Sequence, residues 1–177
     1  LFRSEDFVQQ ILTTLRHETE SRNLPLPAVW IEPGRSIAGP AGTTLYTAGS
    51  SKDIPEIRKY VAVDGGMGDN IRPALYGADY DAVVANDVHD DNVELVTIAG
   101  KYCESGDILI KDIELPVLHP GDVIAVLATG AYGYSMASNY NLNPRPAVVF
   151  VENGKSQIAI ERETYADLIH LDKKLDI

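Results

Sequence analysis

The amino-acid sequence predicts a mainly β protein, an antiparallel β-barrel or sandwich domain that follows a short N-terminal α/β segment. Apolar residues recur at helical spacing between Ser4 and Ser21, which predicts an amphipathic helix. A short apolar run between prolines, Ala28–Ile31, then has the composition of a fully buried strand. From Thr43 onward, short strand-like runs alternate with turn residues, as is typical of barrels and sandwiches.

The expected domain boundary lies where this pattern changes. Residues 1–42 carry the helix, the short strand and the polar turn Glu32–Ser36, which is the order of elements in a parallel α/β unit. Residues 43–177 are expected to form the β domain. Its expected strands are 44–47, 60–64, 81–84, 93–98, 107–110, 122–127, 147–151 and 156–160.

Two turns and one helix complete the expected β domain. Asn153-Gly154 stands between the last two strands and is a strong signal for a β-hairpin turn. The segment His119–Asp122 contains Pro and Gly and predicts a second turn. A short closing helix is expected from Glu163 to Leu171.

Composition argues against several classes of protein. The formal net charge of -11 at pH 7 disfavours a nucleic-acid partner, because phosphate binding requires clustered Lys and Arg. Cys103 is the sole cysteine, so no internal disulfide can form and a cytoplasmic location is expected. No apolar run has the length of a membrane span, and the first residues lack the layout of a signal peptide. The start at Leu1 rather than Met indicates a fragment boundary.

The turn after the first expected strand is a candidate site for an anion. In parallel α/β folds, ligands bind at the carboxyl ends of the strands. Gly34 lets a main-chain amide approach an anion closely, and Arg35 can hold a carboxylate or phosphate with its planar guanidinium. An ordinary strand-to-helix turn with a surface ion pair would have the same residues.

A glycine-rich loop, Asp64–Ile71, precedes Arg72 and Tyr76. Its glycine spacing and Pro73 do not fit a dinucleotide-binding loop. Arg72 and Tyr76 are spaced by one helical turn and so share one face of a short helix. The loop either delivers both side chains to one place or is a purely structural turn.

Two further segments place reactive side chains among small residues. Cys103 and Glu104 adjoin in a loop between two expected strands, although a lone cysteine is more often a small buried residue than a reactive thiol. Residues 129–141 are rich in small side chains, and their tyrosines either lie against a planar ligand or pack on a neighbouring surface. These tyrosines are Tyr132, Tyr134 and Tyr140.

No metal site is expected. Asp87-Val88-His89-Asp90-Asp91 is an acidic turn with one histidine, and its spacing matches no common set of metal ligands. The remaining histidines, His17, His119 and His170, stand singly and are expected to be structural.

Taken together and in this order, residues 30–151 resemble the C-terminal portion of the fold-type III pyridoxal-phosphate-dependent decarboxylases. The resemblance rests on Glu32-Pro33-Gly34-Arg35, on the glycine-rich loop with Arg72 and Tyr76, on Cys-Glu-Ser-Gly-Asp at 103–107 and on the tyrosine segment. Family members that act on ornithine have an aspartate after the cysteine. Glu104 therefore favours the members that decarboxylate meso-diaminopimelate to L-lysine, a step of lysine biosynthesis.

The resemblance implies a role for each of these residues. The contacts to the cofactor pyridoxal 5′-phosphate that it implies are Glu32, Pro33, Gly34, Arg35 and Tyr132. The substrate contacts that it implies are Arg35, Arg72, Tyr76, Glu104 and Tyr132. Cys103 would be the catalytic proton donor and would reach the partner's active site across a homodimer interface. Two cations and one carboxylate complement the distal amino acid group of meso-diaminopimelate.

The resemblance also implies what lies outside this chain. Residues 1–42 would be the last helix and strand of a cofactor-binding (β/α) barrel of the TIM type, and the lysine that holds the cofactor would lie earlier in that barrel. None of the lysines present has the matching context, so the chain alone is expected to be inactive. Tyr80 and Asn143 differ from the residues that are common in the family at these positions, neither of which carries the chemistry.

Two alternatives stay open on the sequence alone. One is a decarboxylase of the same fold that acts on ornithine, arginine or a carboxylated polyamine. The other is a free-standing β domain that serves as a binding or dimerisation module.

Overall fold

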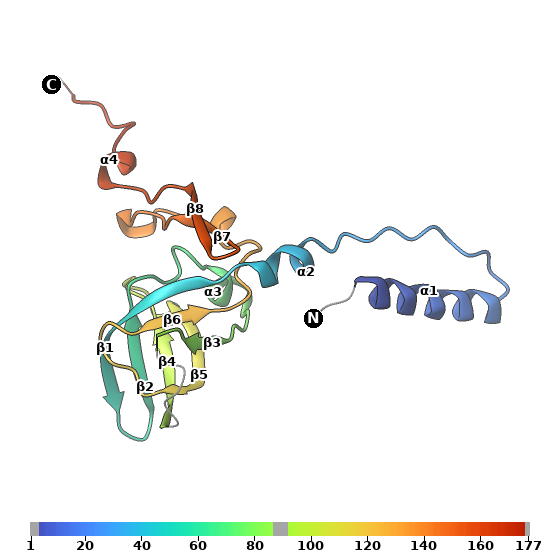
Figure 1. Ribbon diagram of the computed structural model, residues 1–177, viewed down its shortest axis with the longest axis horizontal. Helices are drawn as coiled ribbons and strands as arrows, with labels where there is room; N and C mark the ends of the chain where they lie inside the picture. The colour runs from blue at the N-terminus through green and yellow to red at the C-terminus, as the bar shows by residue number, and fades with distance from the viewer. Residues whose placement is uncertain (1–3, 87–91, 176–177) are drawn as a thin grey trace. The chain divides into compact units, whose positions relative to one another are not determined.

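The computed structural model describes residues 4–86 and 92–175, and these divide into two compact units (Figure 1). The division falls between Ile37 and Ala38, close to the predicted boundary after residue 42. The first unit contains one long helix, an extended segment and all but the last residue of a short helix, Gly34–Ala38. The second contains all the strands of the described residues.

The predicted first helix is confirmed as α1, Ser4–Ser21. Glu5 and Asp6 lie in its first turn, where carboxylates interact favourably with the positive end of the helix dipole. Its apolar face lines a groove together with two residues of the extended segment. The groove is lined by Val8, Ile11, Leu12, Val29 and Ile31.

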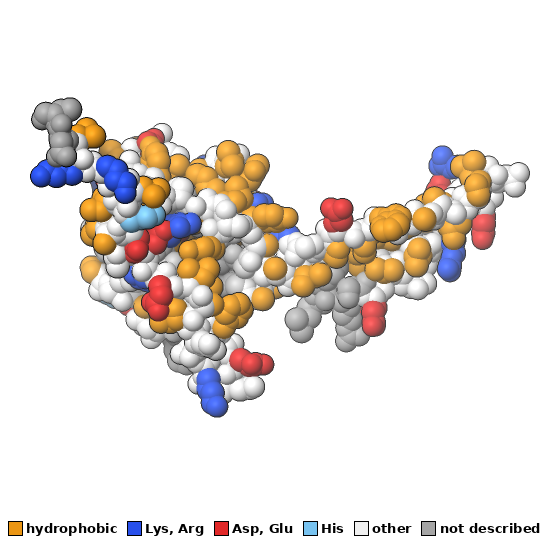
Figure 2. Space-filling view, turned by 90° about the horizontal axis from the view of Figure 1, so that it is seen from above, with side chains coloured by type: hydrophobic (Ala, Val, Ile, Leu, Met, Phe, Trp, Pro, Cys, Tyr) orange, Lys and Arg blue, Asp and Glu red, His pale blue; other side chains and the backbone are white. Residues whose placement is uncertain are grey.

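The prediction of a buried strand at Ala28–Ile31 is wrong for this structure. Residues 24–33 form neither helix nor strand, and Trp30 is 90% exposed. A strand forms only where neighbouring strands satisfy its main-chain N–H and C=O groups, and the described part of this unit offers no such neighbour. Figure 2 shows hydrophobic side chains gathered on the surface of this segment, where Leu24, Leu26 and Val29 are also exposed.

In the second unit, six strands form one curled sheet in the order β3-β6-β1-β2-β4-β5 (Figure 1). The edge strands β3 and β5 contact each other, so the sheet nearly closes into a barrel and the predicted mainly β class is confirmed. The strand bounds are β1 Thr44–Ile54, β2 Arg58–Val63, β3 Ala82–Val84, β4 Val93–Ala99, β5 Ile108–Pro116 and β6 Val123–Val126.

One strand pair corrects the expectation of a purely antiparallel sheet. β2 and β4 are parallel, with Tyr60 opposite Thr97 and Ala62 opposite Ala99. Parallel neighbours need a long crossover connection, and the chain between β2 and β4 supplies one that includes a short helix and β3. The sheet is therefore mixed.

The last two strands form a separate two-stranded sheet. β7, Val148–Glu152, pairs with β8, Lys155–Ile160, in an antiparallel hairpin, which confirms the predicted turn. Asn153 and Gly154 both have positive φ angles, 50° and 73°, as a type I′ turn requires.

The remaining helices are short. They are α2 Gly34–Ala38, α3 Arg72–Tyr76, α4 Tyr165–Leu168 and the 3₁₀ turns Gly39–Ala41, Tyr134–Met136 and Tyr140–Leu142. α4 begins later and ends earlier than the predicted helix from Glu163 to Leu171, because the capping box of Thr164 and Asp167 fixes its first turn. None of the helices in the described part of the chain combines the length and the hydropathy that a membrane crossing needs.

The barrel interior holds a single apolar core. Its fully buried side chains come from neighbouring strands of the sheet, and Ile98 and Ile124 have no exposed surface at all. Tight packing of such β-branched residues fixes the strand order and hence the directions in which the loops leave the barrel.

Replacing Ile124 with Ala is expected to destabilise the 177-residue chain by about 2–5 kcal/mol, since a buried side chain is lost and a cavity is left. Urea unfolding followed by circular dichroism measures the change. The matched control is Leu45→Ala, because Leu45 lies on the adjoining strand but is 63% exposed. Equal losses in the two variants would contradict the assigned core.

Candidate active site

Three loops meet at one rim of the barrel because the strands before them point the same way. β2 and β4 are parallel, and β6 shares their direction because β2 and β6 are both antiparallel to β1. Loop A is residues 64–71, loop B is residues 100–107 and loop C is residues 127–143. Main-chain hydrogen bonds join them: Lys101 N donates to Gly65 O at 2.9 Å, and Ser138 N donates to Gly68 O at 2.8 Å.

The buried carboxylate of Asp107 links loop A to loop B. Asp107 is 3% exposed and accepts hydrogen bonds from the main-chain N–H of Met67 at 2.7 Å and of Tyr102 at 2.8 Å. Burial raises the pKa of this carboxyl group, and the two N–H donors oppose that rise. Asp107 ends the Cys-Glu-Ser-Gly-Asp motif, so the last residue of the motif positions the loop that carries Cys103 and Glu104.

The glycines of loops A and B make room for this carboxylate. A Cβ atom on Gly100 would lie 2.2 Å from a carboxylate oxygen of Asp107, and one on Gly66 would lie 2.5 Å from the other. A Cβ atom on Gly68 would lie 2.0 Å from the hydroxyl oxygen of Tyr102. The glycine residues therefore allow these side chains to approach the backbone closely.

A second, half-buried carboxylate in loop A is that of Asp69. Asp69 accepts a hydrogen bond from the hydroxyl of Tyr46 at 2.5 Å and another from the main-chain N–H of Gly66 at 3.1 Å. Burial raises the pKa of Asp69, and burial together with this carboxyl raises the pKa of Tyr46 well above its usual value. The loop is thus fixed at both ends.

Arg72 lies between two tyrosine rings at the start of α3. Its guanidinium carbon is 5.2 Å from the ring centroid of Tyr76 and 5.5 Å from that of Tyr132, within the range of cation–π contacts. The structure therefore brings together three side chains that the sequence singled out, two from α3 and one from loop C. The Nε of Arg72 is buried and has no hydrogen-bond partner among the described residues.

Asn70 adds unused hydrogen-bonding groups to the same loop. It is 3% exposed, and within the described ranges neither its Oδ1 nor its Nδ2 has a hydrogen-bond partner. A buried amide without partners is costly and uncommon in folded proteins. Loop A thus retains donor and acceptor capacity close in sequence to Arg72, which suits a polar ligand.

Loop C has an unusual concentration of left-handed backbone. Ala128, Tyr132, Asn141 and Leu142 all have φ angles between 54° and 60°. Each such residue costs on the order of 1–3 kcal/mol and persists only where its surroundings hold it. Strain of this kind is common at ligand sites, and here it includes the tyrosine that lies over Arg72.

Cys103 and Glu104 are both exposed in loop B. The structure thus places the thiol on the surface, whereas free cysteines are usually buried. The carboxylate of Glu104 accepts a hydrogen bond from the hydroxyl of Tyr140 in loop C. The ring of Tyr140 lies 6.0 Å from that of Tyr102, the residue before Cys103.

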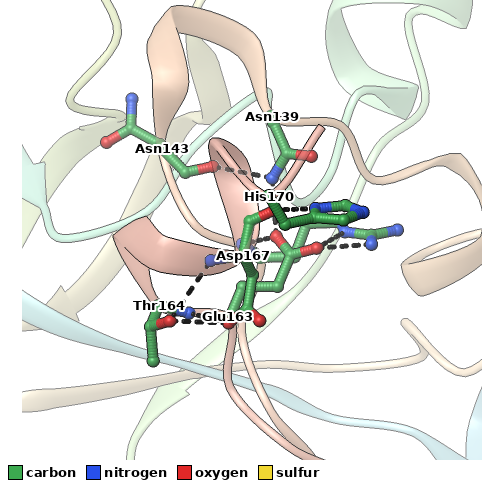
Figure 3. Close-up of polar contacts among 7 residues, drawn as sticks. Asn139, Asn143, Glu163, Thr164, Asp167 and His170 are labelled. Atoms are coloured by element: carbon green, nitrogen blue, oxygen red, sulfur yellow. Dashed lines mark hydrogen bonds and ion pairs between the residues drawn. The ribbon is translucent and has the colours of Figure 1, made fainter. Parts of the chain in front are cut away.

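An ion pair joins the residues just after loop C to the segment after β8 (Figure 3). Arg145 donates from Nε and Nη2 to Oε1 of Glu163 at 2.9 Å and 2.5 Å, and its main-chain N–H donates to Oε2 at 2.8 Å. Asn139 Nδ2 donates to the same Oε2 at 2.6 Å and to the carbonyl of Asn143 at 3.1 Å. These hydrogen bonds, chiefly those from the Arg145 side chain, lower the pKa of Glu163 to about 2.

The helix that follows begins beside this ion pair. Thr164 and Asp167 exchange hydrogen bonds as an N-terminal cap, and Nδ1 of His170 lies 2.5 Å from the carbonyl oxygen of Asp167 (Figure 3). The predicted structural role of His170 agrees with this contact.

The remaining candidate residues, Glu32–Arg35, belong to the first unit. Glu32, Gly34 and Arg35 are exposed, and Pro33 is half-buried. A Cβ atom on Gly34 would meet no described atom within 4 Å, so there is open space beside its Cα atom. The convergence of Arg35 with Arg72 and Glu104 stays a prediction.

The acidic turn Asp87–Asp91 lies outside the described residues. Within residues 4–86 and 92–175, no group of three His, Cys, Asp or Glu side chains is arranged to hold a metal ion.

Four features of the site were missed from sequence: the Tyr140–Glu104 bond, the Arg145–Glu163 pair, the buried carboxylate of Asp107 and the unpartnered amide of Asn70. The Tyr140–Glu104 bond joins two loops separated by two strands, and the Arg145–Glu163 pair spans the whole β7–β8 hairpin. The only available signals were the position of Tyr140 in the tyrosine segment and of Asp107 at the end of its motif. The unpartnered amide of Asn70 had no signal at all, because burial depends on the fold.

The nearly closed β-sheet and its rim of Arg, Tyr and Cys-Glu define a class of protein. Residues 36–130 match the family described as pyridoxal-dependent decarboxylase, C-terminal sheet domain. The match covers more than half of the chain, and the chain belongs to this family.

Within that family, the chain is similar to diaminopimelate decarboxylases. It is 56% identical over 167 residues to the one from Bacillus subtilis (strain 168), which covers 94% of this chain and 38% of the relative. The crystal structure of diaminopimelate decarboxylase from M. jannaschii aligns with a TM-score of 0.82 at 37% identity, over 97% of this chain and 38% of that one. A second structure of that enzyme, in complex with L-lysine, aligns with a TM-score of 0.79 at 38% identity, over 90% of this chain and 36% of that one. The chain thus spans less than two fifths of the length of these relatives.

Replacing Asp107 with Ala is expected to loosen loops A and B. Two main-chain N–H groups lose their acceptor, at a cost of about 1–3 kcal/mol for each buried donor left unpaired. Urea unfolding of the chain measures the loss, and amide hydrogen exchange at Met67 and Tyr102 locates it. Asp79→Asn, at an exposed carboxylate, is the control. Unchanged exchange at both amides would show that Asp107 does not hold the loops.

Replacing Glu163 with Gln is expected to remove a pH-dependent part of the stability. The pKa of Glu163 in the folded chain is about 2, below the ordinary value of 4.5, so its contribution is complete above pH 4.5, shrinks below that pH and is lost as the pH falls through 2. Urea midpoints should be lower for the variant at pH 7, and most of the difference should be gone at pH 2.

The matched control for this experiment is Glu161→Gln, because Glu161 is exposed and lies on the same segment. Its midpoints should follow those of the unchanged chain at every pH. A difference between chain and Glu163→Gln that stays constant down to pH 2 would show that the ion pair is not its source.

Proposed function

We propose that the full-length protein is a pyridoxal-phosphate-dependent decarboxylase that converts meso-diaminopimelate to L-lysine. The observation that carries the proposal is that the loops at one rim carry both a cation and a carboxylate. Arg72 is held between two tyrosine rings with a buried donor unused, and Glu104 presents a carboxylate on a loop bonded to the same glycine-rich segment.

This arrangement complements one end of the proposed substrate. Meso-diaminopimelate has an amino acid group at each end, and the end away from the reacting carbon carries one carboxylate and one ammonium. Arg72 would bind the carboxylate, with Arg35 as a second cation and Tyr76 as a hydrogen-bond donor. Glu104 would bind the ammonium. Charge-assisted hydrogen bonds of this kind are strong and directional, and they reject molecules that lack either group.

The residues present fit the cofactor. The exposed residues Gly34 and Arg35 would supply a main-chain amide and a guanidinium as donors for its phosphate, and the ring of Tyr132 is held by strained backbone next to Arg72. When bound, pyridoxal phosphate supplies the electron sink that lets the α-carbon lose carbon dioxide. This chain contributes contacts to that group, whereas the lysine that anchors it is proposed to lie in the preceding part of the protein.

Cys103 is the proposed proton donor to the α-carbon after carbon dioxide leaves. Its thiol is exposed on loop B, next to the residue that would bind the substrate ammonium. A surface thiol can act inside an active site only if another surface closes over it. We therefore propose a homodimer in which each Cys103 completes the site of the partner, in the cytoplasm.

The exposed apolar residues of the first unit support a preceding barrel. Trp30 at 90%, Leu24 at 57% and Leu26 at 50% exposed form a hydrophobic surface on a segment without strand partners. Such a surface is normally covered by protein. The strands of a cofactor-binding barrel would cover it and would supply the hydrogen bonds that residues 28–31 need to become the predicted strand.

The test uses the full-length protein with pyridoxal phosphate and measures the release of carbon dioxide and L-lysine from meso-diaminopimelate. Cys103→Ala should lower kcat by about 100-fold or more, the usual contribution of a general acid, with little change in KM. Glu104→Gln should mainly raise KM.

Ser105→Ala is the matched control, because Ser105 is exposed in the same loop. Turnover of ornithine or arginine in preference to meso-diaminopimelate would refute the proposed substrate. An unchanged kcat in Cys103→Ala would remove the proposed proton donor.

A further inference from the structure

The hydroxyl group of Tyr140 donates a hydrogen bond to Oε1 of Glu104, the carboxylate that the proposed function assigns to the substrate ammonium. The contact joins loop C to loop B across the rim. It was not expected from the sequence, and no step of the proposed reaction requires it. Whether this hydrogen bond can position the carboxylate of Glu104 depends on how firmly the backbone of each residue is held.

The Glu104 side of the contact is fixed by loop B. The main-chain N–H of Glu104 donates to Tyr102 O at 2.8 Å, and its carbonyl accepts from Asp107 N at 3.1 Å. Tyr102 is buried and its own N–H is bonded to the Asp107 carboxylate at 2.8 Å. The backbone of Glu104 is therefore set, whereas its side chain keeps several rotatable bonds.

The Tyr140 side is fixed by loop C. The carbonyl of Tyr140 accepts from Asn143 N at 3.3 Å and from Asn143 Nδ2 at 3.2 Å. On one flank, the Asn139 side chain is bonded to Glu163 (Figure 3). On the other, Arg145 is bonded to the same carboxylate. The tyrosine thus stands in a turn that is tied down on both sides.

The hydrogen bond therefore joins two residues with fixed backbones through one flexible carboxylate, and it can hold that carboxylate in one orientation. Ordering a free Glu side chain on binding costs rotamer entropy, and a tyrosine that already holds one oxygen reduces this cost. The bond to Glu104 also raises the pKa of Tyr140 above its ordinary value of 10.0, which agrees with the phenol acting as the donor. The second oxygen of Glu104 is then directed to a single place.

We infer that Tyr140 is a positioning residue that fixes the Glu104 carboxylate and thereby sets selectivity for substrates with a distal ammonium group. The inference rests on the proposed function, because Glu104 is given its substrate role there. It adds a residue from a different loop and a specific consequence, namely that selectivity depends on a phenolic hydroxyl that does not touch the reacting carbon.

The experiment compares two inhibitors of the full-length protein. L-lysine keeps the ammonium and carboxylate of the distal group, whereas 6-aminohexanoate keeps the carboxylate and lacks that ammonium. Tyr140→Phe removes only the hydroxyl. It should weaken inhibition by L-lysine, and raise KM for meso-diaminopimelate, by about tenfold, the effect of one hydrogen bond to a charged group. Inhibition by 6-aminohexanoate and kcat should stay unchanged.

Two controls separate a local effect from a general one. Tyr134→Phe removes a hydroxyl from the same loop, where the Tyr134 ring lies 5.5 Å from the guanidinium of Arg145, and should leave both inhibition constants unchanged. In a Glu104→Ala background, which removes the acceptor, Tyr140→Phe should have little further effect on inhibition by L-lysine. This second comparison decides the matter even if Tyr140→Phe reduces the stability of the protein.

The outcomes distinguish the inference from the function on which it rests. If the unaltered protein does not decarboxylate meso-diaminopimelate, or inhibition by L-lysine is no stronger than by 6-aminohexanoate, the proposed function fails. If the unaltered protein prefers L-lysine and Tyr140→Phe keeps the same preference, only the role of Tyr140 fails. Equal weakening of both inhibitors would also overturn it, because it would show a general disturbance of the loop.

Discussion

The rim of the barrel depends on the buried carboxylate of Asp107. A carboxylate has no donors of its own, so it can be buried here only because two main-chain N–H groups point at it. Those N–H groups belong to loops A and B, and the glycines of both loops are required for the approach. One buried group therefore explains why the glycine-rich stretch exists, why it lies against the cysteine loop, and why the motif at residues 103–107 ends in aspartate.

The common direction of three strands brings the loops that follow them to the same rim. β2, β4 and β6 run the same way, so the loops that follow them leave the barrel at one rim although they are far apart in sequence. Loops A and B are fixed through Asp107 and Asp69. Loop C is different, because it carries strained backbone, and the Arg145–Glu163 ion pair together with Asn139 holds its far end. Rigid strands thus support loops that each bring one kind of side chain to the site.

The sequence predicted the features that depend on residues close together in the chain. It missed those that depend on contacts between distant segments. All eight strands, the Asn153-Gly154 turn and α1 were predicted, because alternation, helical spacing and turn chemistry are local properties. The spacing of Arg72 and Tyr76 predicted a shared helical face for the same reason. The parallel pairing of β2 with β4, the position of Tyr132 over Arg72 and the bonds of Tyr140 and Glu163 were not predicted, because each joins segments that only the fold brings together. The prediction for residues 28–31 was wrong for a different reason. Their composition predicts a buried strand, and the described residues supply no neighbouring strand to pair with it.

The exposed segment at residues 28–31 and the unpaired polar groups of loop A are both energetically unfavourable within the described residues. Trp30 is exposed although its transfer from water would be favourable, and Asn70 is buried although no described group bonds to its amide. The first condition is relieved by covering apolar surface with protein, the second by adding polar partners. Each condition is relieved separately, by contact with surface outside the described residues. Both features agree with a chain that belongs to a family of C-terminal sheet domains and spans less than two fifths of the length of its relatives.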